Sequence, residues 1–226
     1  DSSGKTFADP RFQFNVTDGK LTDVRVPRGT RFSAGEAIGT LNPMNHVHLI
    51  AGRPGAEMNA LDALVLPGVS DSIPPVIENV GVFDENWTPI ETDSRERRIR
   101  ISGKTRLMVR AYDRTDGNAE RRRLAPYKVS YSISSPGSEP QMPESWNISF
   151  ERMPVFNAVK TAYAVGSHSG ATGETIFNFA VTNKVNGDEF ADGFLDTTPL
   201  TPGQYTIRVF VVDFFGNLAT KDIPVE

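Results

Sequence analysis

Closely spaced prolines and glycines limit this chain to short elements of secondary structure. Sixteen prolines and nineteen glycines are spread over 226 residues, and both residue types disfavour the interior of a helix. The runs between them are rich in Val, Ile, Phe and Tyr, which favour strands. The sequence therefore predicts an all-β protein, with one short helical turn expected over 59–64.

Apolar runs bounded by turn residues are concentrated in the last two thirds of the chain. In 106–112, for example, Leu107, Val109 and Ala111 alternate with more polar residues, as expected for a strand with one buried face. Seven or more such strands with turns between them are typical of a β-sandwich. The predicted strands are 76–83, 98–102, 106–112, 127–133, 145–150, 175–182, 205–212 and 218–225.

A proline-rich segment predicts a boundary between two domains. Pro67-Gly68 is a turn pair, residues 70–72 are polar, and Ile73-Pro74-Pro75 requires an extended backbone. We therefore expect a first domain over 1–66, a linker over 67–75 and a sandwich domain over 76–226.

Composition excludes several classes of protein. The absence of cysteine rules out disulfides and thiolate metal sites. The net charge is −4 and the charges are mixed, so no basic stripe indicates a nucleic-acid partner. No apolar run approaches the roughly 20 residues of a membrane-spanning helix, and we expect no membrane span.

Two of the three histidines lie in the segment 45–50, as Asn-His-Val-His-Leu-Ile. In a strand, His46 and His48 project from the same face, about 6.5 Å apart along the backbone. They can then serve one metal ion or one reaction centre, or they can simply occupy a polar strand face. A predicted strand-turn-strand unit over 24–41 precedes them.

This run resembles the last part of the catalytic domain of lysostaphin/LytM-type zinc endopeptidases, which cut peptide cross-links in bacterial cell walls. The shared features are the spaced glycines and apolar residues from Val26 to Gly39 and the His-x-His strand that follows. The likeness covers about residues 20–65. It implies that His48 binds zinc and that His46 acts catalytically on the metal-bound water.

The upstream His-x-x-x-Asp motif of that family is missing, because no histidine precedes His46. A catalytic zinc needs three protein ligands, so we expect zinc only where upstream ligands are supplied, and this chain alone to be inactive. The chain begins at Asp1 rather than at a methionine. Two interpretations stay open: the C-terminal part of a larger peptidase, or a degenerate peptidase-like scaffold.

The second half resembles the immunoglobulin-like or fibronectin-type-III-like sandwich that follows the catalytic domain in some bacterial members of this group. The resemblance rests on Val109–Asp113, Ser149–Pro154 and Leu200–Asn217, the last ending in Asp-x-x-Gly-Asn. It implies an extracytoplasmic protein of the bacterial cell envelope: a zinc endopeptidase-like fragment, or a non-catalytic adhesion or binding module. The implied partners are the N-terminal portion of the same precursor, peptidoglycan or an envelope protein.

A calcium site is a further hypothesis. Asp113-Arg114-Thr115-Asp116-Gly117-Asn118 begins like a calcium loop, but the twelfth position is Leu124 rather than the bidentate glutamate of an EF-hand. A plain turn explains the pattern as well. A calcium site between sandwich loops would use Asp113 and Asp116.

Overall fold

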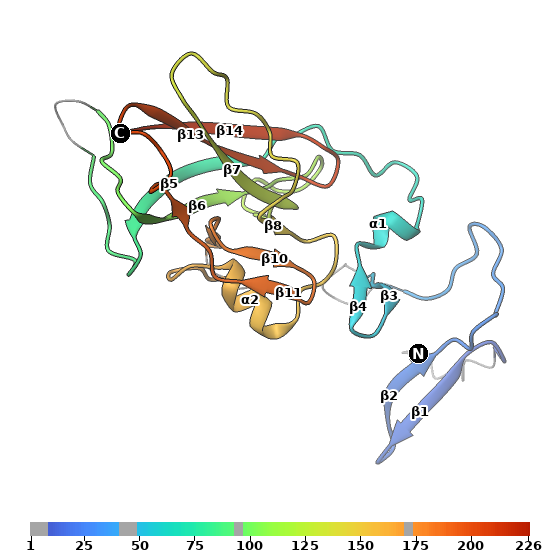
Figure 1. Cartoon of the computed structure of the whole chain (residues 1–226). Helices are drawn as coiled ribbons and strands as arrows, with labels where there is room; N and C mark the ends of the chain where they lie inside the picture. The colour runs from blue at the N-terminus through green and yellow to red at the C-terminus, as the bar shows by residue number, and fades with distance from the viewer. Residues whose placement is uncertain (1–8, 41–48, 93–96, 170–173) are drawn as a thin grey trace. The chain divides into compact units, whose positions relative to one another are not determined.

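The structure is a computed structural model that describes residues 9–40, 49–92, 97–169 and 174–226 (Figure 1). Backbone contacts divide the chain into two compact units, Asp1–His48 and Leu49–Glu226. The predicted linker 67–75 lies inside the second unit. The protein is all-β, as the sequence predicts, and the second unit is built as a sandwich of two sheets.

In the described residues 9–40 of the first unit, β1 (Gln13–Thr17) and β2 (Lys20–Arg25) form a hairpin. Asp18 and Gly19 connect the strands with φ angles of 51° and 70°. This left-handed pair suits the twist of a two-residue hairpin turn.

The strand-turn-strand unit predicted over 24–41 is wrong, because residues 26–40 contain turns but no strand. Pro27 lies two residues after the end of β2 and has no N–H group to continue the ladder. Arg11 instead holds this segment through its contact with Glu36 at 2.5 Å.

The sandwich of the second unit pairs a six-stranded sheet with a four-stranded sheet. The order in the larger sheet is β11-β10-β8-β7-β13-β14, and in the smaller sheet β12-β6-β5 with β9 also paired to β6. The larger sheet comprises β7 (Lys128–Ser134), β8 (Ile148–Ser149), β10 (Lys184–Asn186), β11 (Glu189–Ala191), β13 (Tyr205–Val212) and β14 (Leu218–Val225). The smaller sheet comprises β5 (Val76–Asp84), β6 (Lys104–Tyr112), β9 (Asn178–Ala180) and β12 (Leu195–Asp196).

A small hairpin and a helical turn precede the sandwich. The hairpin joins β3 (Ala51–Arg53) to β4 (Ala56–Met58), and the Met153 N–H donates to the Glu57 carbonyl at 2.8 Å. Helix α1 (Ala60–Ala63) starts at Asn59, whose side chain accepts from the Leu61 N–H. The helical turn predicted over 59–64 is therefore confirmed.

Five of the eight predicted sandwich strands are found close to their expected bounds, as β5, β6, β7, β13 and β14. The predicted strand 98–102 is wrong, because Ile99 forms only isolated bridges to Thr92 and Val225. The strands predicted at 145–150 and 175–182 shorten to β8 and β9. Helix α2 (Phe156–Ala162) was not expected. In the described part of the chain, no helix is long and apolar enough to cross a bilayer.

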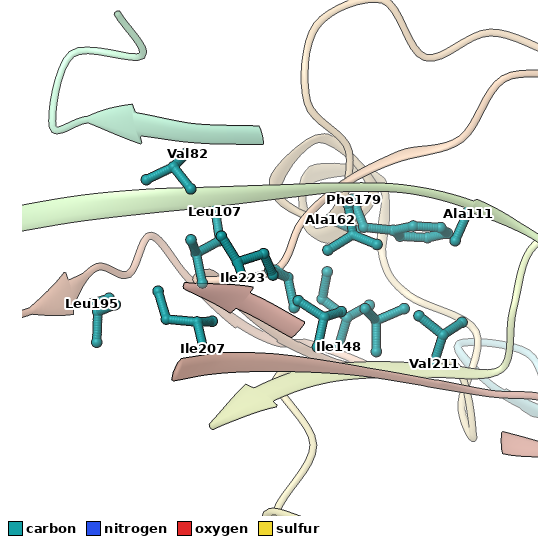
Figure 2. Packing of buried hydrophobic residues seen from close by; sticks show 14 of the residues in the cluster. Val82, Leu107, Ala111, Ile148, Ala162, Phe179, Leu195, Ile207, Val211 and Ile223 are labelled. Carbon is teal, nitrogen blue, oxygen red and sulfur yellow. The ribbon is translucent and has the colours of Figure 1, made fainter. Parts of the chain in front are cut away.

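The core lies between the two sheets. Figure 2 shows side chains from β6, including Leu107 and Ala111, facing Ile207 and Val211 of β13. Leu107 and Val211 are fully buried, and each such side chain contributes about 1.5–3 kcal/mol by leaving water. This packing fixes the ends of β6 and β13, which belong to different sheets, against each other.

Candidate metal centre

Three aspartates that are far apart in the sequence meet at one place in the second unit. Asp71, Asp113 and Asp213 each offer a carboxylate oxygen, and these three oxygens lie within 4.8 Å of one another. The three residues are only 9%, 5% and 3% exposed. Charged side chains this deeply buried are normally paired with an opposite charge or a metal.

Asp113 and Asp213 are carried to this place by the two sheets. Asp113 directly follows β6, and its backbone exchanges hydrogen bonds with Leu124 at 2.8 and 2.9 Å. Asp213 directly follows β13, where its carboxylate accepts from the Asn217 N–H at 2.8 Å and from Asn217 Nδ2 at 2.7 Å. Both strands therefore end at the same site, one from each sheet.

Asp71 comes from the segment that connects α1 to β5. Its Oδ1 accepts from the backbone N–H groups of Ile73 and Asp116, both at 3.1 Å. Its carbonyl oxygen accepts from Asn217 Nδ2 at 3.0 Å. Asn217 thus donates to both Asp71 and Asp213, and it ties the connecting segment to the end of β13.

Two oxygens of the cluster remain open. Asp71 Oδ2 and Asp113 Oδ1 are buried and have no hydrogen-bond partner among the described residues. Within the residues that the structure describes, no lysine or arginine forms a salt bridge with any of the three carboxylates. Arg114 is adjacent in sequence, but its Nε is itself buried without a partner.

The electrostatic cost of this arrangement is visible at Asp113. Burial raises the pKa of its carboxyl to about 7, a backbone hydrogen bond from Arg114 opposes the rise, and the nearby Asp213 and Asp71 add to it. Without a cation, the site therefore favours a proton on Asp113 near neutral pH. A bound cation would remove the same repulsion without the proton.

The donor set indicates which cation fits. Carboxylate and carbonyl oxygens suit hard cations such as Ca²⁺ and Mg²⁺, whereas zinc sites use histidine and cysteine more often. Ca²⁺ accepts six to eight oxygens in flexible geometry, and the two open oxygens provide direct ligands. A surface pocket of about 320 Å³ has Asp213 in its lining, beside Trp146 and Tyr127.

The residues predicted as sites divide as follows. His46 and His48 lie outside the described residues, so the predicted zinc site remains a prediction. Asp113 belongs to the cluster, but Asp116 does not. Asp116 Oδ2 instead accepts from the N–H and Oγ of Ser72, at 3.0 and 3.1 Å, and Asp116-Gly117 forms a turn.

Sequence reasoning missed Asp71 and Asp213 as partners of Asp113. Both stand in motifs that the sequence does reveal, the entry to the Pro-Pro segment and the terminal Asp-x-x-Gly-Asn. Each motif has a sufficient local explanation as a linker or a turn, so neither indicates a ligand by itself.

No protein-family model matches this chain, and no curated protein or solved structure gives a significant match. The functional argument therefore rests on the site itself.

Proposed function

We propose that the Leu49–Glu226 unit is a non-catalytic β-sandwich module that binds a hard divalent cation, foremost Ca²⁺, through Asp71, Asp113 and Asp213. The observation that carries the proposal is the pair of open oxygens, Asp71 Oδ2 and Asp113 Oδ1, inside a buried carboxylate cluster. A cluster of this charge is stabilised most simply by a cation.

The proposal favours an extracytoplasmic location and a binding role at the bacterial cell envelope. Extracellular calcium modules work with dissociation constants of about 0.1–1 mM, which suit surroundings where calcium is abundant. Peptidoglycan or an envelope protein is the proposed partner of the module, consistent with the resemblance at residues 109–113 and 200–217.

Isothermal titration of the 226-residue chain with CaCl₂ at pH 7.5, after removal of metal by EGTA and dialysis, tests the site. We expect one equivalent of Ca²⁺ to bind with a dissociation constant of about 0.1–1 mM. Asp113→Asn should weaken binding at least tenfold, because it removes one charged ligand and keeps the shape.

Asp188→Asn is the matched control for that titration. It makes the same charge change in an exposed turn between β10 and β11, and it should bind Ca²⁺ like the unaltered chain. If titration of the unaltered chain with CaCl₂ released or absorbed no heat of binding, the proposal would be contradicted.

A second candidate function is zinc-dependent peptide hydrolysis by a protein that contains this chain. The observation in its favour is that α1 forms where the peptidase resemblance expects the catalytic domain to close. In that proposal His48 binds zinc, His46 acts on the metal-bound water, and the missing ligands come from an upstream portion of the same precursor.

Zinc content separates this second candidate from the first. We expect the 226-residue chain alone to retain well under one equivalent of zinc, and a longer protein with an upstream His-x-x-x-Asp motif to retain one. His48→Ala should abolish zinc retention in the longer protein. Equal zinc with and without His48 would argue against the peptidase interpretation.

A further inference from the structure

We infer that cation binding at this cluster fastens the segment between α1 and β5, residues 64–75, to the end of the sandwich. The inference rests on the proposed function and adds a regulatory role: the cation concentration sets how tightly this segment is held. It follows from the origin of the ligands, since Asp71 belongs to the segment while Asp113 and Asp213 belong to the two sheets.

The segment has few contacts of its own before it reaches the cluster. Residues 64, 65 and 67–70 are exposed, and Val65 is 95% exposed. The turn at Pro67-Gly68 is closed by a hydrogen bond from Val69 N–H to the Leu66 carbonyl at 3.2 Å. Asp71 is the first buried residue after α1, so it is the point where the segment joins the sandwich.

Among the described residues, backbone N–H groups and a side-chain amide hold Asp71 there, without a salt bridge to a lysine or an arginine. Its Oδ1 accepts from Ile73 and Asp116, and its carbonyl accepts from Asn217. Against these hydrogen bonds stands the repulsion between Asp71 and the two carboxylates that face it, within 4.8 Å.

A bound cation turns the repulsion between Asp71 and the other two carboxylates into a net attraction. With Ca²⁺ bound, the carboxylates that repel Asp71 become co-ligands of the same ion, and releasing the segment requires breaking a metal–oxygen bond. Without Ca²⁺, opening the segment relieves repulsion. Local opening of a segment with few buried contacts is already less costly than global unfolding, so the cation acts where the fold is weakest.

Amide hydrogen exchange of the 226-residue chain, in 5 mM CaCl₂ and in 5 mM EGTA at pH 7.5, tests the inference. The reporter amides are those of Ser72 and Ile73, whose hydrogen bonds end on Asp116 Oδ2 and Asp71 Oδ1. We expect Ca²⁺ to slow exchange in a peptide covering 66–76 by about tenfold.

Two variants show whether the effect passes through the cluster. Asp113→Asn lies outside the segment, yet it should leave exchange in 66–76 equal in CaCl₂ and EGTA. Asp71→Asn keeps an oxygen that accepts from Ile73 and should give the same result, which provides a second variant if the first folds poorly. Asp188→Asn should behave like the unaltered chain.

The outcomes distinguish this inference from the proposed function. If the titration detects Ca²⁺ binding but hydrogen exchange in 66–76 is the same in CaCl₂ and EGTA, the inference is overturned and the cation-binding proposal stands. If the titration detects no Ca²⁺ binding, both are overturned. Calcium-dependent slowing that persists in Asp113→Asn would also overturn it, because the ion would then act elsewhere.

Discussion

Calcium at 10 mM, which is roughly ten to one hundred times the expected dissociation constant, should raise the free energy of unfolding of the sandwich by about 1.4–2.7 kcal/mol. The reason is that three buried carboxylates converge only in the folded state, so the unfolded chain offers no comparable site. For a unit of this size the increase corresponds to a rise of roughly 3–10 °C in the melting temperature.

Tryptophan fluorescence gives the measurement directly. The two tryptophans, Trp87 and Trp146, both lie in the Leu49–Glu226 unit, so thermal melts followed by their emission report on the sandwich. The melts are compared in 10 mM CaCl₂, 10 mM MgCl₂ and 10 mM EGTA. Mg²⁺ should give a smaller rise than Ca²⁺, because it needs near-ideal octahedral geometry and gives up its water reluctantly.

Two variants show whether the calcium-dependent rise in melting temperature arises at the carboxylate cluster. Asp188→Asn should show the full calcium-dependent rise, and Asp113→Asn should show little or none. Identical melting temperatures in CaCl₂ and EGTA for the unaltered chain would contradict a functional site at the cluster.

The central strands of the sandwich could be predicted because their local and tertiary requirements agree. In β13 the run from Tyr205 to Val212 is rich in β-branched residues, and Ile207, Val209 and Val211 are fully buried. The Asp-Phe-Phe-Gly-Asn turn that follows ends the strand with Gly216 at φ 92°, a conformation that favours glycine.

The short strands could not be predicted, because pairing with neighbouring strands creates them and their own composition does not reveal it. In β10 only Val185 is buried, and its flanking residues Lys184 and Asn186 are exposed. The strand forms through its pairing, antiparallel with β11 and in parallel with β8, where Val185 lies opposite Ile148. Three residues with one apolar side chain carry no periodicity that would reveal this.

Helix α2 has a helical pattern in its sequence, but that pattern is too weak to predict the helix. Ala158 and Ala162 are spaced four residues apart and both are fully buried, which is the spacing of one helix face. Pro154, two residues before the helix, and the lack of a side-chain cap at Val155 make the helical pattern weak in the sequence. Tertiary contacts therefore decide its conformation.

The members of the carboxylate cluster could also be predicted only in part from the sequence. The sequence identifies Asp113 as a candidate ligand, but the residues that join it stand about forty positions before and one hundred positions after it. Only the fact that β6 and β13 end at the same place, beside the segment that enters β5, brings the three together. Asp116, the nearer candidate in sequence, is directed to Ser72 instead.

Without calcium, the stability of the sandwich is expected to fall as the pH rises through about 7. In the folded chain, burial and the neighbouring carboxylates raise the pKa of Asp113 to about 7, from an ordinary value of 3.8. Between these two values the folded state holds a proton that the unfolded state has released. The stabilisation from that proton is therefore complete below pH 4 and is lost as the pH passes through about 7.

Urea titrations in EGTA at pH 5, 6, 7 and 8 measure this loss. Each pKa unit corresponds to about 1.4 kcal/mol, so we expect a decrease on the order of 3 kcal/mol in the unaltered chain relative to Asp113→Asn, which cannot titrate at this position. In EGTA at pH 8 the variant should be the more stable of the two proteins.

Calcium should reverse that order. In 10 mM CaCl₂ at pH 8 the unaltered chain gains a bound ion that Asp113→Asn cannot hold, so the unaltered chain should then be the more stable protein. A variant whose stability parallels that of the unaltered chain at every pH would show that Asp113 is ionised in the folded state without cost. The buried cluster would then have no need of a cation.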